Sequence, residues 1–169
     1  MDRVVVGIDG SEAARRALAW AIEEARGRDA KLDIVHAYHL PPSDNTERSA
    51  YAAAAQGGIS RVDVEEFQRR REEELRNARN QALGRIDRAL ERVDADPSGV
   101  QIERHAVVGK HPEQALIELS RGASLLVVGS RGRGAVAGRL LGSVSRACVE
   151  HAHCPVVVLP PDTVEDAKR

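Results

Sequence analysis

Glycine, serine and arginine are concentrated between residues 129 and 145, where the chain reads GSRGRGAVAGRLLGSVS. Glycines allow backbone N–H groups to turn toward an anion and approach it closely, and a following helix adds the partial positive charge of its N-terminus. Ser143 and Ser145 could donate hydroxyl hydrogen bonds to phosphate oxygens. Three arginines could supply positive charge: Arg131, Arg133 and Arg139. The segment therefore predicts a phosphate site, and the simpler alternative is a glycine-rich connection that only lets a strand and a helix pack together.

Two common phosphate-binding patterns are absent from this segment. No lysine follows any of its glycines, so the P-loop pattern GxxxxGK[ST] does not occur. The spacing Gly132-x-Gly134-x-x-x-Gly138 is one residue too long for the dinucleotide pattern, and it follows a late strand rather than the first. The residues therefore argue against a P-loop and disfavour NAD as a ligand.

Short apolar runs alternate with longer segments of helical periodicity along the chain, which is typical of βαβ units around a parallel sheet. Strands are predicted at residues 3–8, 31–39, 100–108, 124–129 and 155–159. Helices are predicted from Ser11, as N-cap, to about Gly27, and over residues 61–93, 111–120 and about 139–151. The expected fold is α/β: a single doubly wound, Rossmann-like domain with a five-stranded parallel sheet and helices on both faces.

Two of the predicted helices carry apolar faces of different kinds. The first has apolar residues at spacings of three and four, so that they share one face: Ala14, Leu18, Ala21, Ile22 and Ala25. The long helix over 61–93 is heavily charged and has only a narrow apolar stripe: Phe67, Leu75, Ala78, Ala82, Ile86, Ala89 and Val93. We expect it to be a solvated helix packed on the sheet by one face. Before it, residues 40–60 combine turn chemistry with an alanine-rich middle and predict a long functional or mobile loop.

The phosphate segment follows strand 124–129, which is the most apolar and is therefore expected inside the sheet. Ligands of open α/β sheets bind at the carboxyl ends of such strands. Gly129-x-x-Gly132, followed by nine residues and then Gly142-Ser143, resembles the GxxG-x9-G[ST] nucleotide motif of the universal stress proteins. The first strand's ending GIDGS and the closing segment HAHCPVVV at 151–158 are similar to that family too, so the resemblance covers essentially the whole chain.

This resemblance implies an ATP-binding domain over residues 1–160, with residues 161–169 as a C-terminal tail. It implies that Asp9 meets the ribose and phosphate region and could lie near a nucleotide-bound Mg²⁺, that Ala37 offers backbone hydrogen bonds to adenine, and that the residues after Gly142 hold the phosphates. The residues implied to contact the nucleotide are Gly7, Ile8, Asp9, Ala37, Val128, Gly129, Arg131, Gly132, Gly142, Ser143, Val144 and Ser145. It also implies a homodimer formed through the last strand, residues 155–159.

The expected function is that of a stress-response protein that binds ATP and uses its occupancy as a signal, acting on an unidentified protein partner or on dimer stability. Asp9 is the only obvious carboxylate in the expected cleft, so we expect no catalytic residue and at most slow ATP hydrolysis. One alternative is a slow ATPase or phosphotransferase. Another is a scaffold protein whose pocket is empty or filled by cyclic AMP. The 40–60 segment could lie over the nucleotide as a lid.

Composition excludes several other classes. The 25 basic and 26 acidic side chains nearly cancel, and aromatic residues make up 2% of the chain, so a nucleic-acid partner is not expected. No stretch of about 18 apolar residues could cross a membrane. Two cysteines cannot form a disulfide framework, and no export signal opens the chain, so the cytoplasm is the expected compartment. Cys148, His151, His153 and Cys154 are close in sequence, but they span the change from helix to strand, and we expect no metal cluster there.

Overall fold

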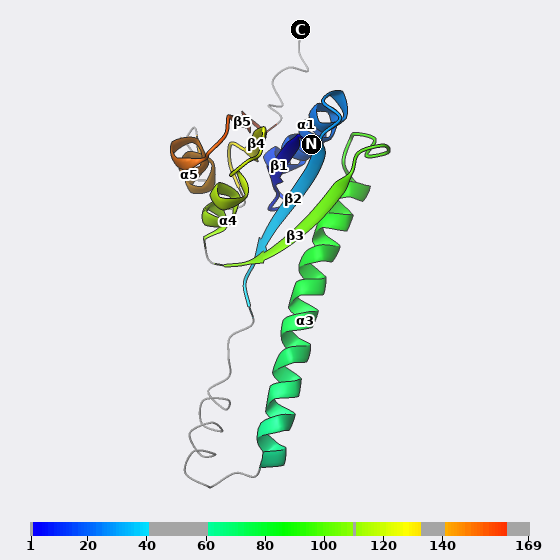
Figure 1. Ribbon diagram of the computed structural model, residues 1–169, viewed down its shortest axis with the longest axis vertical. Helices are drawn as coiled ribbons and strands as arrows, with labels where there is room; N and C mark the ends of the chain where they lie inside the picture. The colour runs from blue at the N-terminus through cyan, green and yellow to red at the C-terminus, as the bar shows by residue number, and fades with distance from the viewer. Residues whose placement is uncertain (1, 41–60, 110, 133–140, 162–169) are drawn as a thin grey trace.

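The computed structural model describes residues 2–40, 61–109, 111–132 and 141–161. Five strands and four helices alternate in these ranges (Figure 1). The strands are β1 (Arg3–Gly7), β2 (Lys31–Tyr38), β3 (Ile102–Val108), β4 (Leu125–Gly129) and β5 (Val156–Leu159). The helices are α1 (Glu12–Gly27), α3 (Arg61–Glu91), α4 (Pro112–Leu119) and α5 (Ser143–His151). The described helices include none that is long and apolar enough to cross a membrane.

The strands form one parallel sheet in the order β3-β2-β1-β4-β5. The predicted α/β class and the five-stranded parallel sheet are confirmed. β4 lies inside the sheet between β1 and β5, as its apolar sequence predicted, and four of its five residues are buried. Strand order reverses between β1 and β4, and this is the point at which doubly wound sheets open a crevice at their carboxyl ends.

Helices cover both faces of the sheet. One core contains β-strand residues such as Val4, Val6 and Ile34 together with the apolar faces of α1 and α3. The other core contains Val5 and Val128 together with residues of α4 and α5. Because side chains alternate along a strand, successive valines of β1 enter different cores. The prediction of helices on both faces is therefore confirmed.

The start and the buried face of α1 are as the sequence predicted. Ser11 is the N-cap: its backbone is extended, and its hydroxyl oxygen accepts a hydrogen bond from the Ala14 N–H at 3.2 Å. The five predicted apolar residues of this helix are all buried. A capped helix with one apolar face holds the turn after β1 against the sheet.

Only the C-terminal half of α3 packs on the sheet. Ala82 and Ile86 are buried, whereas none of the described residues between 64 and 81 is. Figure 1 shows α3 continuing well beyond β2 and β3. The prediction of a solvated helix packed by one face therefore holds for one half of its length.

Several predicted boundaries differ from the observed ones, mostly by one or two residues, and the start of α5 differs most. The helix expected from about residue 139 begins at Ser143, because Gly142 is extended (φ −73°, ψ 171°) and serves as the N-cap. The N–H of Gly142 donates to the Ser130 carbonyl at 2.7 Å, which holds this residue outside the helix. The strand expected from residue 100 begins at Ile102. The predicted 40–60 loop from residue 41 onward, the tail from residue 162, Arg133 and Arg139 lie outside the described residues.

Candidate functional site

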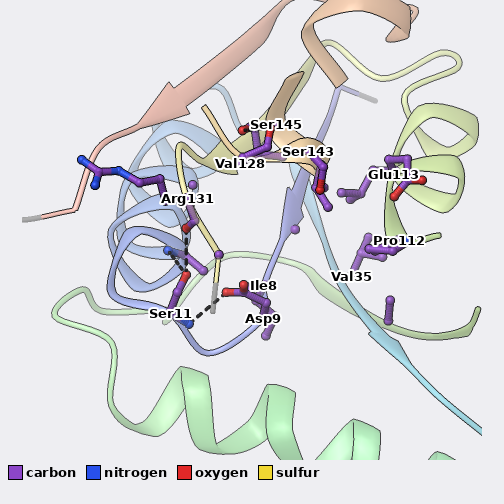
Figure 2. A pocket seen from close by; sticks show the side chains of 18 of the residues that line it. Ile8, Asp9, Ser11, Val35, Pro112, Glu113, Val128, Arg131, Ser143 and Ser145 are labelled. Atoms are coloured by element: carbon purple, nitrogen blue, oxygen red, sulfur yellow. Dashed lines mark hydrogen bonds between the residues drawn. The ribbon is translucent and has the colours of Figure 1, made fainter. Parts of the chain in front are cut away.

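A cavity of about 780 Å³ lies at the carboxyl ends of the strands, next to the point where strand order reverses. Figure 2 shows the side chains of many of the residues that line it. All twelve residues predicted to contact a nucleotide line this one cavity. They come from the ends of β1, β2 and β4, from the loop after β4 and from the first turn of α5. The structure therefore brings the predicted set together, and its contact with a nucleotide stays a prediction.

Asp9 is held in place where the chain leaves β1. Its Oδ1 accepts a hydrogen bond from the Ser11 N–H at 2.9 Å. The preceding carbonyl, that of Ile8, accepts from Nδ1 of the buried His36 at 3.0 Å. A Cβ built on Gly132 would lie 2.5 Å from Oδ2 of Asp9, so the carboxylate occupies space that a side chain at position 132 would need. The main chain at Gly132, in the loop after β4, and the Asp9 carboxylate are thus packed against each other.

The loop after β4 is fixed to the start of α1. The hydroxyl of Ser11 donates to the Arg131 carbonyl at 3.2 Å. A Cβ on Gly129 would lie 2.8–2.9 Å from main-chain and Cβ atoms of Ala13 and Ala14, so only glycine fits this close approach of helix and strand. Figure 2 shows the guanidinium of Arg131 pointing away from Asp9 and Ser143. Arg131 therefore lines the cavity, but its charged group is directed away from Asp9 and Ser143.

The N-terminus of α5 opens onto the cavity. Among the described residues, no side chain caps this terminus, and its first turn contains no acidic residue. Ser143 is exposed, so its hydroxyl can reach a ligand. Ser145 is 2% exposed, and its hydroxyl lies 3.0 Å from the Ser130 carbonyl and 3.1 Å from the Gly142 carbonyl. A hydroxyl has one proton to donate, so Ser145 holds the loop and Ser143 is the serine that remains to donate to a phosphate.

The cavity also contains charged residues that the sequence analysis had not assigned to it. His111 and Glu113 line it from the start of α4, and the two side chains are 3.0 Å apart between Nδ1 and Oε1. A carboxylate only accepts, so Nδ1 carries the proton and donates. Asp9 is therefore not the only carboxylate in the cleft. The signal was present, because α4 starts directly after the carboxyl end of β3, which is the same edge of the sheet.

Apolar residues complete the cavity wall. They were also not predicted, and they lie on β2, on α4 and just before α5: Val35, Pro112, Leu116 and Leu141. Behind this wall, the buried Cys148 has its thiol pKa raised to about 11, first by burial and then by the negative charge of Glu113.

The cysteine–histidine segment near the C-terminal end of α5 does not gather into a metal site. Cys148 is buried, Cys154 is half-buried and both are free thiols. In the described ranges, the group of three potential metal ligands that lies within reach of one ion is on β2 and β3, and it contains none of Cys148, His151, His153 and Cys154.

Comparison with known proteins relates the whole chain to one family. A model described as the universal stress protein family matches residues 1–160. A universal stress protein of Mycobacterium tuberculosis (strain ATCC 25618 / H37Rv) is 35% identical over 164 residues, covering 97% of this chain and 50% of the relative. The chain spans about half the length of the curated relatives it matches.

Solved structures give the same relation. A universal stress protein in complex with cAMP is 32% identical, with a TM-score of 0.54, and the match covers 95% of this chain and 98% of that one. A universal stress protein family protein from Arabidopsis thaliana with AMP bound has a TM-score of 0.55 over 99% of this chain and 97% of that one. At 21% identity, this second likeness shows the fold alone.

Proposed function

The chain belongs to the universal stress protein family, and we propose on that premise that it binds an adenine nucleotide, with ATP as the first candidate, in the cavity beside Asp9. The observation that carries the proposal is the N-terminus of α5, which opens onto the cavity. Within the part of the chain that the structure describes, no side chain caps it, and its first turn has no acidic residue. N–H groups that lack partners at a helix terminus, together with the helix dipole, suit phosphate oxygens.

The remaining walls suit the other parts of a nucleotide. The Asp9 carboxylate can accept hydrogen bonds from ribose hydroxyls, and its oxygens are the kind of ligand that a nucleotide-bound Mg²⁺ takes. The end of β2 at Ala37, with the apolar side chains of Val35 and Leu116, offers main-chain groups and a surface for adenine. A volume of about 780 Å³ lies within the range of pockets for small ligands, roughly 300–1,000 Å³.

Calorimetric titration with ATP, AMP and cAMP tests this proposal. We expect one site per chain, and we expect Ser143→Ala to weaken nucleotide binding by about tenfold, because a hydrogen bond to a charged group contributes about 1.5–3 kcal/mol. Ser98→Ala is the matched control, since Ser98 is also exposed and lies outside the cavity. Binding of none of the three nucleotides, or unchanged affinity in both Ser143→Ala and Asp9→Asn, would overturn the proposal.

Cyclic AMP is the second candidate ligand. Two observations favour it: the relative that is 32% identical was solved in complex with cAMP, and the guanidinium of Arg131 points away from the described part of the cavity. A ligand with one phosphate charge needs less positive charge around it than a triphosphate. Mass spectrometry of the ligand released from freshly purified, denatured protein decides between the two nucleotides.

Nucleotide occupancy would serve as a signal in a stress response, read by a protein partner or through dimer stability. Slow hydrolysis is a further candidate activity, and the paired His111 and Glu113 favour it. With Nδ1 donating to Glu113, Nε2 of His111 is the nitrogen that can accept a proton from water. In a single-turnover ATP assay, Glu113→Gln should reduce product formation without weakening ATP binding, because the substitution removes a negative charge from the cavity. No product from the wild-type protein would remove this candidate.

A homodimer through β5 completes the proposed function. β5 is an edge strand, and its four residues, Val156–Leu159, are all half-buried. An apolar edge strand with unpaired N–H and C=O groups favours pairing with a second strand. The curated relatives are about twice as long as this chain, which agrees with two such units acting together.

A further inference from the structure

Three side chains that could bind a metal ion lie together on β2 and β3, and none of them lines the nucleotide cavity. Asp33 on β2 is the register partner of Glu103 on β3, and His105 follows two residues later on β3. Because side chains alternate along strands, all three project from the same face of the sheet. The Asp33 side chain is 1% exposed, that of His105 22% and that of Glu103 51%. The group therefore extends from the buried surface of the sheet to solvent.

Each carboxylate accepts a hydrogen bond from a cation through one oxygen, and its other oxygen lies near His105; for Asp33 that second oxygen also lies 3.6 Å from Lys31 Nζ. Arg3 Nη1 donates to Asp33 Oδ2 at 3.3 Å, and Lys31 Nζ donates to Glu103 Oε2. The other two oxygens, Asp33 Oδ1 and Glu103 Oε1, lie 3.5 Å and 3.7 Å from Nε2 of His105. No described residue forms a hydrogen bond with Asp33 Oδ1 or His105 Nε2, although both atoms are buried. Buried polar atoms that lack hydrogen bonds are uncommon and costly, so a ligand between these atoms would relieve that cost.

The spacing of the three atoms fits a small metal ion. Zinc binds nitrogen and oxygen ligands at about 2.0–2.2 Å, so two ligands of a tetrahedral ion lie about 3.4 Å apart. The two measured separations are close to that value, and the three atoms all lie within 4.8 Å of one another. An ion could therefore enter through small side-chain movements, without a change in strand register.

The geometry points to a binding site for a divalent transition-metal ion, with Asp33 Oδ1, Glu103 Oε1 and His105 Nε2 as ligands and water in the remaining positions. One imidazole and two carboxylates suit zinc, cobalt, manganese or ferrous iron, whereas copper(I) prefers sulfur ligands. Arg3 and Lys31 orient the carboxylates from outside, as hydrogen-bond partners of metal ligands do in other sites.

Lys31 orients one metal ligand, Glu103, and competes with the ion for another, Asp33. Its Nζ lies 3.6 Å from Asp33 Oδ1, the same oxygen that would bind the ion. Arg3 and Lys31 together balance the two negative charges of Asp33 and Glu103, so a dication enters a group with no net negative charge. Removal of the Lys31 charge should therefore tighten metal binding, which an ion-pair network with no metal function would not predict.

The bound ion would join β3 to β2. β3 is the edge strand of the sheet, and its ligands Glu103 and His105 would be tied through the ion to Asp33 on the neighbouring strand. Because the ligand atoms come together only in the folded chain, metal binding would raise the melting temperature.

Titration of the full-length chain with Co²⁺ and Zn²⁺ tests the site. We expect one ion per chain, a Co²⁺ absorption spectrum without a thiolate charge-transfer band, and a melting temperature that rises with Zn²⁺. Asp33→Asn, Glu103→Gln and His105→Gln should each weaken binding at least roughly tenfold, and Lys31→Met should strengthen it. His151→Gln is the matched control, because His151 is an exposed histidine beside a carboxylate, with 3.9 Å between its Nε2 and Glu150 Oε2.

Three results would overturn the inference. The first is that neither the wild-type chain nor Lys31→Met binds a metal ion. The second is wild-type affinity in both Glu103→Gln and His105→Gln, and the third is a thiolate charge-transfer band that disappears in Cys154→Ser. Glu103 and His105 are the decisive positions, because both side chains reach solvent and their substitution leaves the core intact. Asp33→Asn is interpreted only when its circular dichroism matches that of the wild-type chain.

Discussion

Asp9 and Gly132 are close neighbours in the lining of the cavity, and their proximity leads to a testable prediction. In Gly132→Ala the new Cβ would lie 2.5 Å from Asp9 Oδ2, so the carboxylate must move. If Asp9 binds the nucleotide, affinity should fall about tenfold or more, since a charged hydrogen bond contributes about 1.5–3 kcal/mol. Calorimetric titration of the variant measures this change.

Gly27→Ala is the control for that substitution. Gly27 lies outside the cavity, and its Cβ would have no such neighbour within 4 Å among the described residues. Both variants should keep the wild-type circular dichroism, and only Gly132→Ala should lose nucleotide affinity. Equal affinity in the two variants would contradict the role assigned to Asp9.

The two cysteines should differ in reactivity. Burial, with a contribution from Glu113, raises the thiol pKa of Cys148 to about 11, so only roughly 0.3% of it is thiolate at pH 8.5. Burial also raises the pKa of Cys154, but Arg3 opposes that shift. Iodoacetamide at pH 8.5 should therefore alkylate Cys154 first, and Cys148 only after denaturation. Peptide mass spectrometry measures the order, and faster modification of Cys148 in the native protein would contradict it.

The same pKa predicts how stability responds to alkaline pH. The unfolded Cys148 thiol ionises near its ordinary value of 9.0, whereas the folded one ionises near 11. Above pH 9 the unfolded state therefore releases a proton that the folded state retains, and the free energy of unfolding decreases as pH rises. Cys148→Ala should show a smaller decrease between pH 9 and 11 in urea titrations.

At the scale of elements, the apolar stripe of α3 is covered by the sheet along only part of its length. A helix of 31 residues is about 46 Å long, whereas the eight residues of β2 span about 26 Å. The sheet therefore cannot cover the whole stripe. Ile86 is fully buried, and Leu75, on the same stripe, is only half-buried.

This difference predicts unequal effects of truncation. Ile86→Ala should lower the free energy of unfolding by about 2–5 kcal/mol, because it removes buried methyl groups and leaves a cavity. Leu75→Ala should cost less than about 1 kcal/mol, because less apolar surface is lost and alanine favours the helix. Urea unfolding measures both. Equal losses would mean that the N-terminal half of α3 is covered in solution.

The start of α5 shows why an element boundary was harder to predict than the element. The sequence Arg-Leu-Leu before Gly142 has helical composition, and periodicity alone extends the helix back through it. The boundary depends instead on the hydrogen bond between the Gly142 N–H and the Ser130 carbonyl. That contact joins residues 12 positions apart, so local propensity does not contain it.

At the scale of the whole molecule, the β5 edge predicts assembly. The Pro155 and Leu159 carbonyls accept hydrogen bonds from β4, so by the two-residue period the N–H groups of Val156 and Val158 face away from β4. Val158→Pro removes an outward N–H and should convert the proposed dimer to a monomer without disturbing the β4–β5 ladder. Val158→Ala, which keeps the N–H, should remain a dimer. Multi-angle light scattering measures both, and a monomeric wild-type chain would refute the proposed interface.

The sequence pattern was sufficient for the α/β class, the five-stranded parallel sheet and the edge at which the cavity opens, because apolar runs mark the strands and a parallel sheet brings their carboxyl ends together. The individual strand-end residues of the cavity came from the resemblance to the family. Three side-chain features were not predictable: the hydrogen-bond partners of the Ser145 hydroxyl, the direction of the Arg131 guanidinium, and the pairing of His111 with Glu113. Each depends on which neighbour a side chain reaches after folding, and residue type alone does not determine that choice.

The overhanging half of α3 affects how the protein moves through water. The projecting half is roughly 23 Å long, and a molecule with such a projection has more friction than a sphere of the same mass. The chain should therefore elute early from gel filtration, at an apparent mass above its true mass. This early elution is expected even of a monomer such as the Val158→Pro variant.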